Sequence, residues 1–132
     1  MNVVLAPMLN IARVPFSGRN FETVGEDPHL AKVLAREIVS GIQQEGVLAC
    51  AKHFAMNNQE IDRGEINVVV DERTRFEIYY PAFSEAIKAG VLSVMCSYNK
   101  VNGDWACENP QLASELRSIL GYKFFVMSDW RG

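Results

Sequence analysis

Four short apolar runs recur along the chain. They cover residues 2–6, 46–54, 91–98 and 124–128, and all are rich in residues that favour β-strands. Apolar residues within each run are consecutive rather than alternating, which is typical of parallel strands covered on both faces. A further extended run, INVVVD at residues 66–71, predicts an additional strand or arm.

Helical patterns lie between these runs. In the first, Asp27 is placed as an N-cap and Pro28 as the first helical residue, and an apolar stripe stops before Gly46. The stripe has i+4 spacing and consists of Leu30, Leu34, Ile38 and Ile42. The second pattern, residues 71–90, contains Pro81, which predicts a kink or two consecutive helices because proline removes a backbone donor.

The third helical pattern opens with Asn109 and Pro110 and ends before Gly121. Strands that alternate with helices predict right-handed crossovers and a parallel sheet. A (β/α)8 barrel needs roughly 250 residues, so we expect an α/β fold that is either a small open sheet or about half of a TIM-type (β/α)8 barrel. No repeat or linker divides the 132 residues, which predicts one unit.

Composition narrows the classes of partner. The chain is 48% hydrophobic and 22% charged, which is typical of a globular protein. Its net charge is -3 and its basic residues are scattered, so the sequence predicts no general attraction to nucleic acid or to an anionic membrane. No apolar window approaches the roughly 18 residues of a membrane span. We therefore expect neither nucleic acid nor a membrane as a partner.

The three cysteines neither form a disulfide framework nor show metal-ligand spacing. Cys50 lies in the apolar run VLACA and is interpreted as a small buried thiol. Cys96 and Cys107 flank a glycine-containing loop, and they either stay free or pair in an oxidising compartment. No metal site and no cofactor is predicted.

Polar residues follow three of the predicted strands where each ends. Lys52 and His53 follow LACA, Tyr98 follows LSVMCS, and Asp129 and Trp130 follow FFVMS. Singly, each has an ordinary interpretation: a surface Lys-His pair, a core aromatic, a helix N-cap. Because ligands of parallel α/β sheets bind at the carboxyl ends of the strands, their repetition favours a site on one face.

The residue types on this face suit a polyhydroxylated ligand. Charged side chains hold hydroxyls through strong hydrogen bonds, and aromatic rings cover the apolar faces of a sugar. The candidates are Lys52, His53, Arg63, Asn57, Asn58 and Asp129 for the hydroxyls, and Trp130 and Tyr98 for the faces. Asp129 is also suited to be a nucleophile, because a buried strand fixes its position and nearby cations keep it ionised.

Four ordered segments resemble a known family. They are GRNFETVGEDP (18–28), AKHFAMNNQEIDR (51–63), VMCSYNKVNG (94–103) and MSDW (127–130). In order and spacing they are similar to the N-terminal barrel domain of family 3 glycoside hydrolases of the β-glucosidase type. The resemblance covers essentially residues 1–132 and implies a partial barrel domain. It also implies a retaining, exo-acting β-glycosidase that hydrolyses terminal non-reducing β-D-glucosyl residues through a covalent glycosyl-aspartate.

The resemblance implies roles for individual residues. Asp129, in the SDW motif, corresponds to the catalytic nucleophile. The residues that correspond to the substrate-binding set are Arg19, Lys52, His53, Arg63, Met95, Tyr98 and Trp130. Tyr98 is expected to lie close enough to Asp129 to form a hydrogen bond. No acidic residue here corresponds to the general acid/base, so a second domain of the same polypeptide is expected to supply it, and the fragment alone is expected to be inactive and poorly folded.

Alternatives remain open at this stage. The loop after Phe54 reads AMNNQ and lacks the histidine of the hexosaminidase branch, so the resemblance favours a glucosidase, a β-xylosidase or a related exo-acting enzyme. A non-catalytic carbohydrate-binding or scaffold domain, and an unrelated half-barrel that binds a partner, are the other classes. The implied partner is a β-glucoside or oligosaccharide. The residues assign no compartment, although secretion or a periplasmic location is common in the resembled family.

Overall fold

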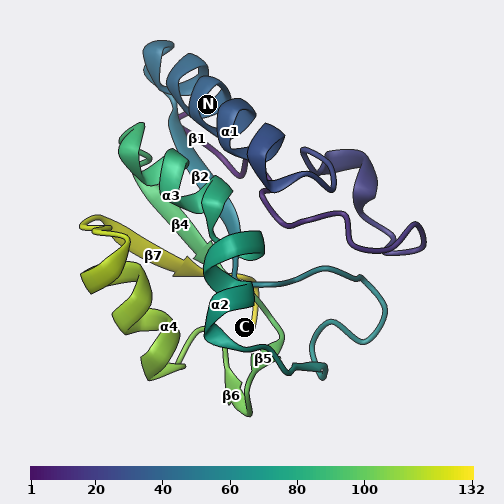
Figure 1. Ribbon diagram of the computed structural model, residues 1–132. Helices are drawn as coiled ribbons and strands as arrows, with labels where there is room; N and C mark the ends of the chain where they lie inside the picture. Colours follow the sequence, from purple (N-terminus) through teal and green to yellow (C-terminus); the bar gives the residue numbers. More distant parts are fainter.

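The computed structural model describes all 132 residues and brings the four apolar runs into one parallel sheet (Figure 1). Its strands are β1 (Val3–Val4), β2 (Leu48–Phe54), β4 (Ser93–Cys96) and β7 (Phe125–Ser128), in the order β1-β2-β4-β7. Each neighbouring pair is parallel. Strands that neighbour one another in chain order, with helices between them, are the arrangement of part of a (β/α)8 barrel. The predicted fold class is confirmed.

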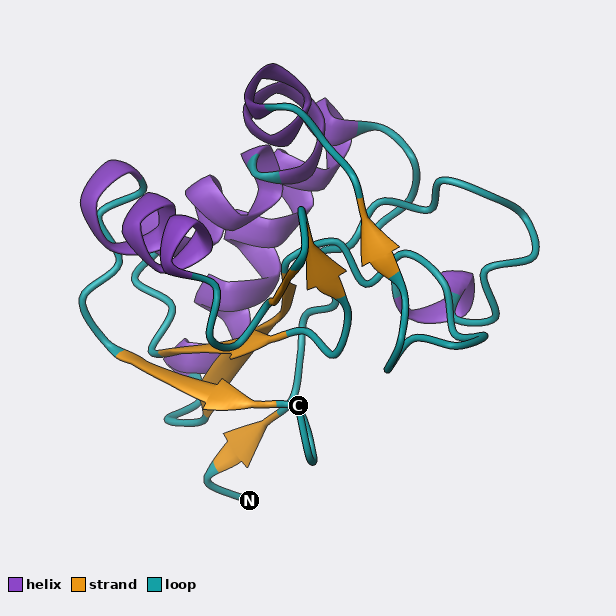
Figure 2. Ribbon diagram, turned by 90° about the horizontal axis from the view of Figure 1, so that it is seen from below, coloured by secondary structure: helices purple, strands orange, loops and turns teal.

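The helices gather on one side of this sheet (Figure 2). The longest is α1 (Pro28–Gln44), which begins as predicted: the side chain of Asp27 accepts hydrogen bonds from the backbone N–H groups of His29 and Leu30. Capping and the proline at the first turn both act locally, which is why the sequence alone located this end.

The buried face of α1 differs from the predicted stripe. Its fully buried residues are Ala31, Ala35 and Val39. Leu30 is 49% exposed, and the other residues of the predicted stripe are only partly buried. The spacing was right, but the face is displaced by one position, because α1 packs on α3 (Pro81–Lys88) and small side chains allow two helix axes to approach closely.

Pro81 divides the second helical pattern, as predicted. α2 (Glu72–Thr74) continues into the π-helical turn η2 (Arg75–Tyr79), and α3 begins at Pro81. The third pattern forms α4 (Pro110–Ser114) and the π-helical turn η3 (Glu115–Ile119). It is followed by Gly121 at φ +77°, a left-handed conformation that favours glycine.

A second, small sheet lies beyond the carboxyl ends of the main strands. β3 (Asn67–Val68), from the predicted extended run, pairs in parallel with β5 (Lys100–Val101), which pairs antiparallel with β6 (Asp104–Trp105). The β5–β6 hairpin was not predicted, although the Asn-Gly pair at residues 102–103 is the usual signal for such a turn.

A disulfide joins the end of β4 to the segment after β6. It links Cys96 and Cys107, whose Cα atoms are 5.1 Å apart, and so decides between the two alternatives left by the sequence. Cys50 is a buried free thiol, as predicted.

The core lies between the main sheet and the helices that cover it. At its centre the ring of Phe54 stacks on Tyr80 and meets Phe83 edge to face, with centroids 5.1 and 5.2 Å apart. The 3-10 turn η1 (Asn20–Glu22) lies outside this core and borders the site described next. None of the helices has the length and apolar character needed to cross a membrane.

Candidate active site

The site begins at the carboxyl end of β2, where the pairing with β4 is irregular. Lys52 lies opposite Met95 and Phe54 opposite Cys96, so His53 is an extra residue in β2. Such a bulge re-aims side chains at the end of a strand. His53 is 1% exposed and the Lys52 side chain 11% exposed, so both predicted binding residues lie inside the molecule.

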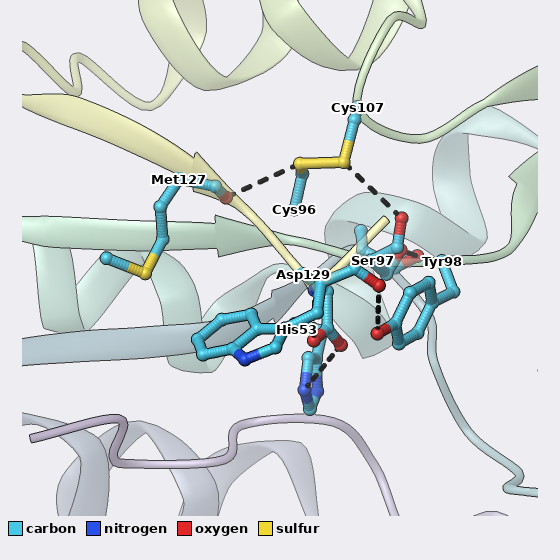
Figure 3. Close-up of a disulfide and its surroundings, with 9 residues drawn as sticks. His53, Cys96, Ser97, Tyr98, Cys107, Met127 and Asp129 are labelled. Carbon is cyan, nitrogen blue, oxygen red and sulfur yellow. Dashed lines mark hydrogen bonds and ion pairs between the residues drawn. A yellow bond between two sulfur atoms is a disulfide. The ribbon is translucent and has the colours of Figure 1, made fainter. Parts of the chain in front are cut away.

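His53 and Asp129 meet across the sheet from the ends of β2 and β7 (Figure 3). The Nε2 atom of His53 lies 3.3 Å from Oδ2 of Asp129. Asn10 holds the backbone of His53 on both sides: its Oδ1 accepts from the His53 N–H at 2.8 Å and its Nδ2 donates to the His53 carbonyl at 2.9 Å. Asn10 was not predicted as a site residue, although it follows the apolar segment LAPML.

Burial is the main reason why His53 is uncharged. It lowers the pKa of the imidazole from its ordinary 6.5 to about 3, and three nearby cations add to the effect. These cations are Arg19, Lys52 and Arg63. The contact between His53 and Asp129 is therefore not an ion pair. A neutral imidazole carries a single N–H, so His53 acts as a hydrogen-bonding group without charge.

Asp129 has one oxygen that the protein leaves free. Its side chain is 13% exposed, and Oδ1 accepts a hydrogen bond of 3.0 Å from the backbone N–H of Trp130. Oδ2 is buried and accepts none. A buried oxygen without a partner is rare in folded proteins and marks a position where a ligand or water is accommodated.

Tyr98 and Trp130 lie beside Asp129, but the Tyr98 hydroxyl has a different acceptor from the expected Asp129 carboxylate. The Tyr98 hydroxyl donates to the backbone carbonyl of Trp130, and burial followed by the charge of Asp129 raises the pKa of this hydroxyl. The Arg63 guanidinium carbon lies 4.8 Å from the Tyr98 ring centroid, within the range of a cation–π contact. Trp130 is 60% exposed, which leaves its ring available as an aromatic wall.

A cavity of about 560 Å³ opens beside these two aromatic residues. Its walls are Gly64, Ser97, Tyr98, Trp105, Cys107, Glu108, Trp130, Arg131 and Gly132. Lys52, His53 and Asp129 are not among them, whereas Tyr98 and Trp130, which lie beside Asp129, are. Trp105, in the unpredicted hairpin, is a third aromatic ring that sequence reasoning missed.

Two glutamates that were not predicted hold the cations of the site. Glu22 contacts Arg19 at 2.7 Å and Lys52 at 3.3 Å. Glu60 contacts Arg63 at 3.0 Å and lies 3.6 Å from Arg19. Both glutamates lie within the segments GRNFE and NNQE that flank the predicted cations. The three cations are thus brought together by carboxylates from two different loops.

The remaining candidates differ in exposure. Met95 is 2% exposed in the middle of the sheet, next to Lys52 and Met127. Asn57 and Asn58 are 3% and 7% exposed, and the Nδ2 atoms of both lack a hydrogen-bond partner. These asparagines line two narrow clefts beside Arg19 and Arg63 rather than the large cavity.

Fold and site together define a class of protein: a (β/α)8-type domain with a carboxylate, a neutral histidine, cations and aromatic rings at its strand ends. The chain belongs to glycosyl hydrolase family 3, because the family model described as "Glycosyl hydrolase family 3 N terminal domain" matches residues 1–132.

Relatives of known name support this membership. Probable beta-glucosidase L of Aspergillus terreus is 46% identical over 98% of this chain and 18% of its own length. The beta-glucosidase of Rhizobium radiobacter is 50% identical over 99% of this chain and 16% of its own. The chain therefore spans less than one fifth of the length of these relatives.

Solved structures show the same fold. DesR, a beta-glucosidase from Streptomyces venezuelae in complex with D-glucose, matches with a TM-score of 0.96 and 46% identity over 98% of this chain and 17% of that one. Beta-glucosidase 3B from Thermotoga neapolitana in complex with glucose matches with a TM-score of 0.94 and 45% identity, over 98% of this chain and 18% of that one.

Proposed function

We propose that this chain supplies the nucleophile and part of the sugar-binding subsite of a retaining, exo-acting β-glucosidase. The observation that carries the proposal is the buried, unpartnered Oδ2 of Asp129 at the end of β7, 3.3 Å from a neutral His53. Membership of family 3 and the β-glucosidase names of the relatives support the reaction and the substrate class.

In the proposed reaction, Asp129 attacks the anomeric carbon of a terminal β-glucosyl residue. A bond forms between the carboxylate oxygen and that carbon while the bond to the aglycone oxygen breaks, and a second carboxyl group protonates the leaving oxygen. The same second group then takes a proton from water, and the water oxygen displaces Asp129 from the anomeric carbon. Two displacements release the sugar with its configuration retained.

The second carboxyl group is proposed to come from another part of the same polypeptide. Glu22 and Glu60 are the carboxylates nearest the cations of the site, and both are engaged in ion pairs. Burial by itself would raise the pKa of Glu22, but the hydrogen bond from Arg19 and the charge of Lys52 outweigh it and lower the pKa. A carboxylate held ionised in this way is a poor general acid.

The substrate-binding residues take different roles in the proposal. Arg19, Lys52 and Arg63 offer charged donors to hydroxyls. The Nδ1 atom of His53 lies 3.2 Å from Oδ1 of Asn10, which can only accept, so the neutral ring offers its Nε2 atom as an uncharged acceptor. The Nη1 atom of Arg19 is buried and makes no hydrogen bond within the protein, so it is available to a sugar hydroxyl. Tyr98, Trp130 and the buried Met95 form the apolar side of the subsite.

Replacement of the nucleophile tests this proposal. In the full-length protein, Asp129→Ala should lower kcat for an aryl β-glucoside by about 10⁴-fold or more, because no covalent intermediate can form. Added azide should partly restore turnover by entering the space of the carboxylate and giving a glycosyl azide. Unchanged turnover in Asp129→Ala, with sugar binding retained, would instead favour a non-catalytic carbohydrate-binding domain.

Product stereochemistry tests the retaining mechanism separately. Proton NMR spectra recorded during early turnover of an aryl β-glucoside should show the β-anomer of glucose first, followed by slow mutarotation to the α-anomer. The α-anomer as the first product would exclude a covalent glycosyl-aspartate formed in a double displacement.

A further inference from the structure

We propose that Glu22 is a positioning residue for sugar recognition: it holds Arg19 and Lys52 on one carboxylate and so sets where their free donors point. The inference rests on the proposed function, since it concerns the same subsite. No role was expected for Glu22 from the sequence, and it does not belong to the substrate-binding set that the motifs imply.

Each oxygen of Glu22 serves a different cation. Oε1 accepts from Nε of Arg19 at 2.7 Å, and Oε2 lies 3.3 Å from Nζ of Lys52. The three side chains are 26%, 18% and 11% exposed for Glu22, Arg19 and Lys52 respectively. Charges that are largely withdrawn from water interact more strongly than surface charges, so this bridge restrains both cations.

The backbone places Glu22 near β2, with the segment of Met8 between them. Met8 forms parallel bridges with both Thr23 and Lys52, so the residue after Glu22 and the cation of β2 lie on opposite sides of Met8. The loop is tied down as well, since the Asn20 side chain donates to the carbonyls of Val14 and Pro15 at 2.8 and 3.1 Å. Glu22 is therefore held at a defined position rather than at the tip of a free loop.

The contact with Glu22 decides which donors of Arg19 remain for a ligand. Glu22 takes Nε, on one side of the guanidinium, while Nη1 is buried without a hydrogen bond. The nearest carboxylate oxygen of Glu60 is 3.6 Å from Nη1, too far for a hydrogen bond. Because the guanidinium is planar, fixing Nε also fixes the direction of the unpaired Nη1 donor.

Charge supports the same role. Without Glu22, two cations would face each other in a partly buried site, and their repulsion would displace at least one of them. The pKa of Glu22 is lowered although burial opposes this, so the carboxylate stays ionised and keeps both contacts over the neutral pH range. Misplacement of a binding group by about 1 Å can cost roughly 10²-fold in rate.

Two variants separate the effect of the charge of Glu22 from the effect of its side-chain length. Glu22→Gln keeps the shape but removes the charge, and its amide N–H group would face one of the cations. Glu22→Asp keeps the charge but is one methylene shorter, so it can hold only one cation. Glu77→Gln is the matched control, because Glu77 forms an exposed 2.8 Å ion pair with Arg73 away from the site.

The test measures kcat and KM of the full-length protein for 4-nitrophenyl β-D-glucoside and for the analogues that lack one hydroxyl at a time. Glu22→Gln should lose roughly 10- to 100-fold in kcat/KM on the parent substrate. The loss in kcat/KM caused by removing at least one substrate hydroxyl should also shrink by about tenfold, because the displaced cations no longer bind that hydroxyl. Glu22→Asp should be intermediate, and Glu77→Gln should match the unmodified protein.

A structural role alone would give a different result. If Glu22→Gln lowered the thermal midpoint or the rate but kept the unmodified protein's loss in kcat/KM for every missing hydroxyl, Glu22 would not be a positioning residue. Calorimetric titration with glucose gives a readout without turnover, and Glu22→Gln should weaken Kd by about tenfold. If the unmodified protein bound glucose but hydrolysed no glucoside, the proposed function would fail, while this titration would still test the role of Glu22.

Discussion

The charge of His53 is set by its surroundings rather than by the residue type. Its pKa is about 3 in the folded chain against 6.5 when exposed, so between these values the unfolded state binds more protons. The stabilising contribution of His53 is therefore complete above about pH 6.5 and is lost as the pH falls toward 3. This is the reverse of a histidine that gains a carboxylate partner and becomes charged.

Acid should consequently destabilise the site through His53. Between pH 7 and pH 4.5 we expect a loss of about 2 to 3 kcal/mol from this residue alone. Thermal midpoints of the full-length protein at the two pH values measure this loss of stability. The loss should be smaller in His53→Gln, because the glutamine side chain is neutral at both pH values. His29→Gln, at an exposed position in the first turn of α1, is the control. An equal acid loss in His53→Gln would contradict the assignment of a neutral, buried imidazole.

At the scale of elements, a buried ion pair joins two helical segments. Arg75 of η2 contacts Glu115 of η3 through two bonds, Nη2 to Oε1 at 2.7 Å and Nε to Oε2 at 3.2 Å. Tyr80 donates to the same carboxylate at 2.5 Å, and Arg75 and Glu115 are 2% and 5% exposed. Removal of one partner from such a pair leaves a buried charge without compensation.

Arg75→Met should therefore lower the stability of the full-length protein by about 3 kcal/mol. The double variant Arg75→Met/Glu115→Leu should recover part of this, because no charge is then left buried. Arg73→Met is the control, since the Arg73–Glu77 pair is exposed and such pairs contribute about 0.5 kcal/mol or less. Thermal unfolding monitored by circular dichroism measures all three, and an equal loss in Arg73→Met and Arg75→Met would contradict the argument.

The disulfide connects the small sheet to the main one. Cys96 lies opposite Ser128 in the β4–β7 pair, and Cys107 follows the β5–β6 hairpin that carries Trp105. Closing a loop of this length stabilises a protein by roughly 2 to 3 kcal/mol. Cys96→Ser/Cys107→Ser should lower the thermal midpoint accordingly, and a dithiol reductant should lower the midpoint of the unmodified protein more than that of the variant. An equal effect of the reductant on both would argue against the link.

At the scale of the whole molecule, the last strand presents apolar side chains to solvent. Phe125 and Val126 of β7 are 48% and 38% exposed, and Phe124 just before the strand is 50% exposed. β7 has a neighbouring strand on one side only. Uncovered strand edges and apolar patches of this kind promote association. Relatives more than five times as long as this chain contain further residues that can cover such a surface.

Residues 1–132 produced alone should therefore bind the dye ANS and unfold without a sharp transition. The full-length protein should not bind ANS and should unfold in a sharp transition, because the rest of the polypeptide would cover β7. Aggregation in size-exclusion chromatography is a second readout. Cooperative unfolding of residues 1–132 together with hydrolysis of an aryl β-glucoside would contradict this prediction, and would also place the general acid within the chain.

Much of the fold, and the gathering of polar residues at the strand ends, could be predicted from the sequence. Asp27, Pro81 and Gly121 mark the ends of helices because caps, prolines and glycines act within a turn of the residue itself. The meeting of His53 and Asp129 was predicted because parallel strands bring their carboxyl ends together. Glu22 was missed, since its segment GRNFE does not reveal that folding brings the distant Lys52 to its carboxylate.

By itself, therefore, the sequence determined the order of the main strands and helices, the ends of several helices and the types of residue at the strand ends. Only the tertiary structure decided which face of α1 is buried, that Cys96 bonds to Cys107, that Glu22 bridges two cations, and that His53 is neutral. The physical reason is range: helix ends depend on backbone groups a few residues away, whereas burial, ion pairing and pKa depend on which distant segments pack around a side chain.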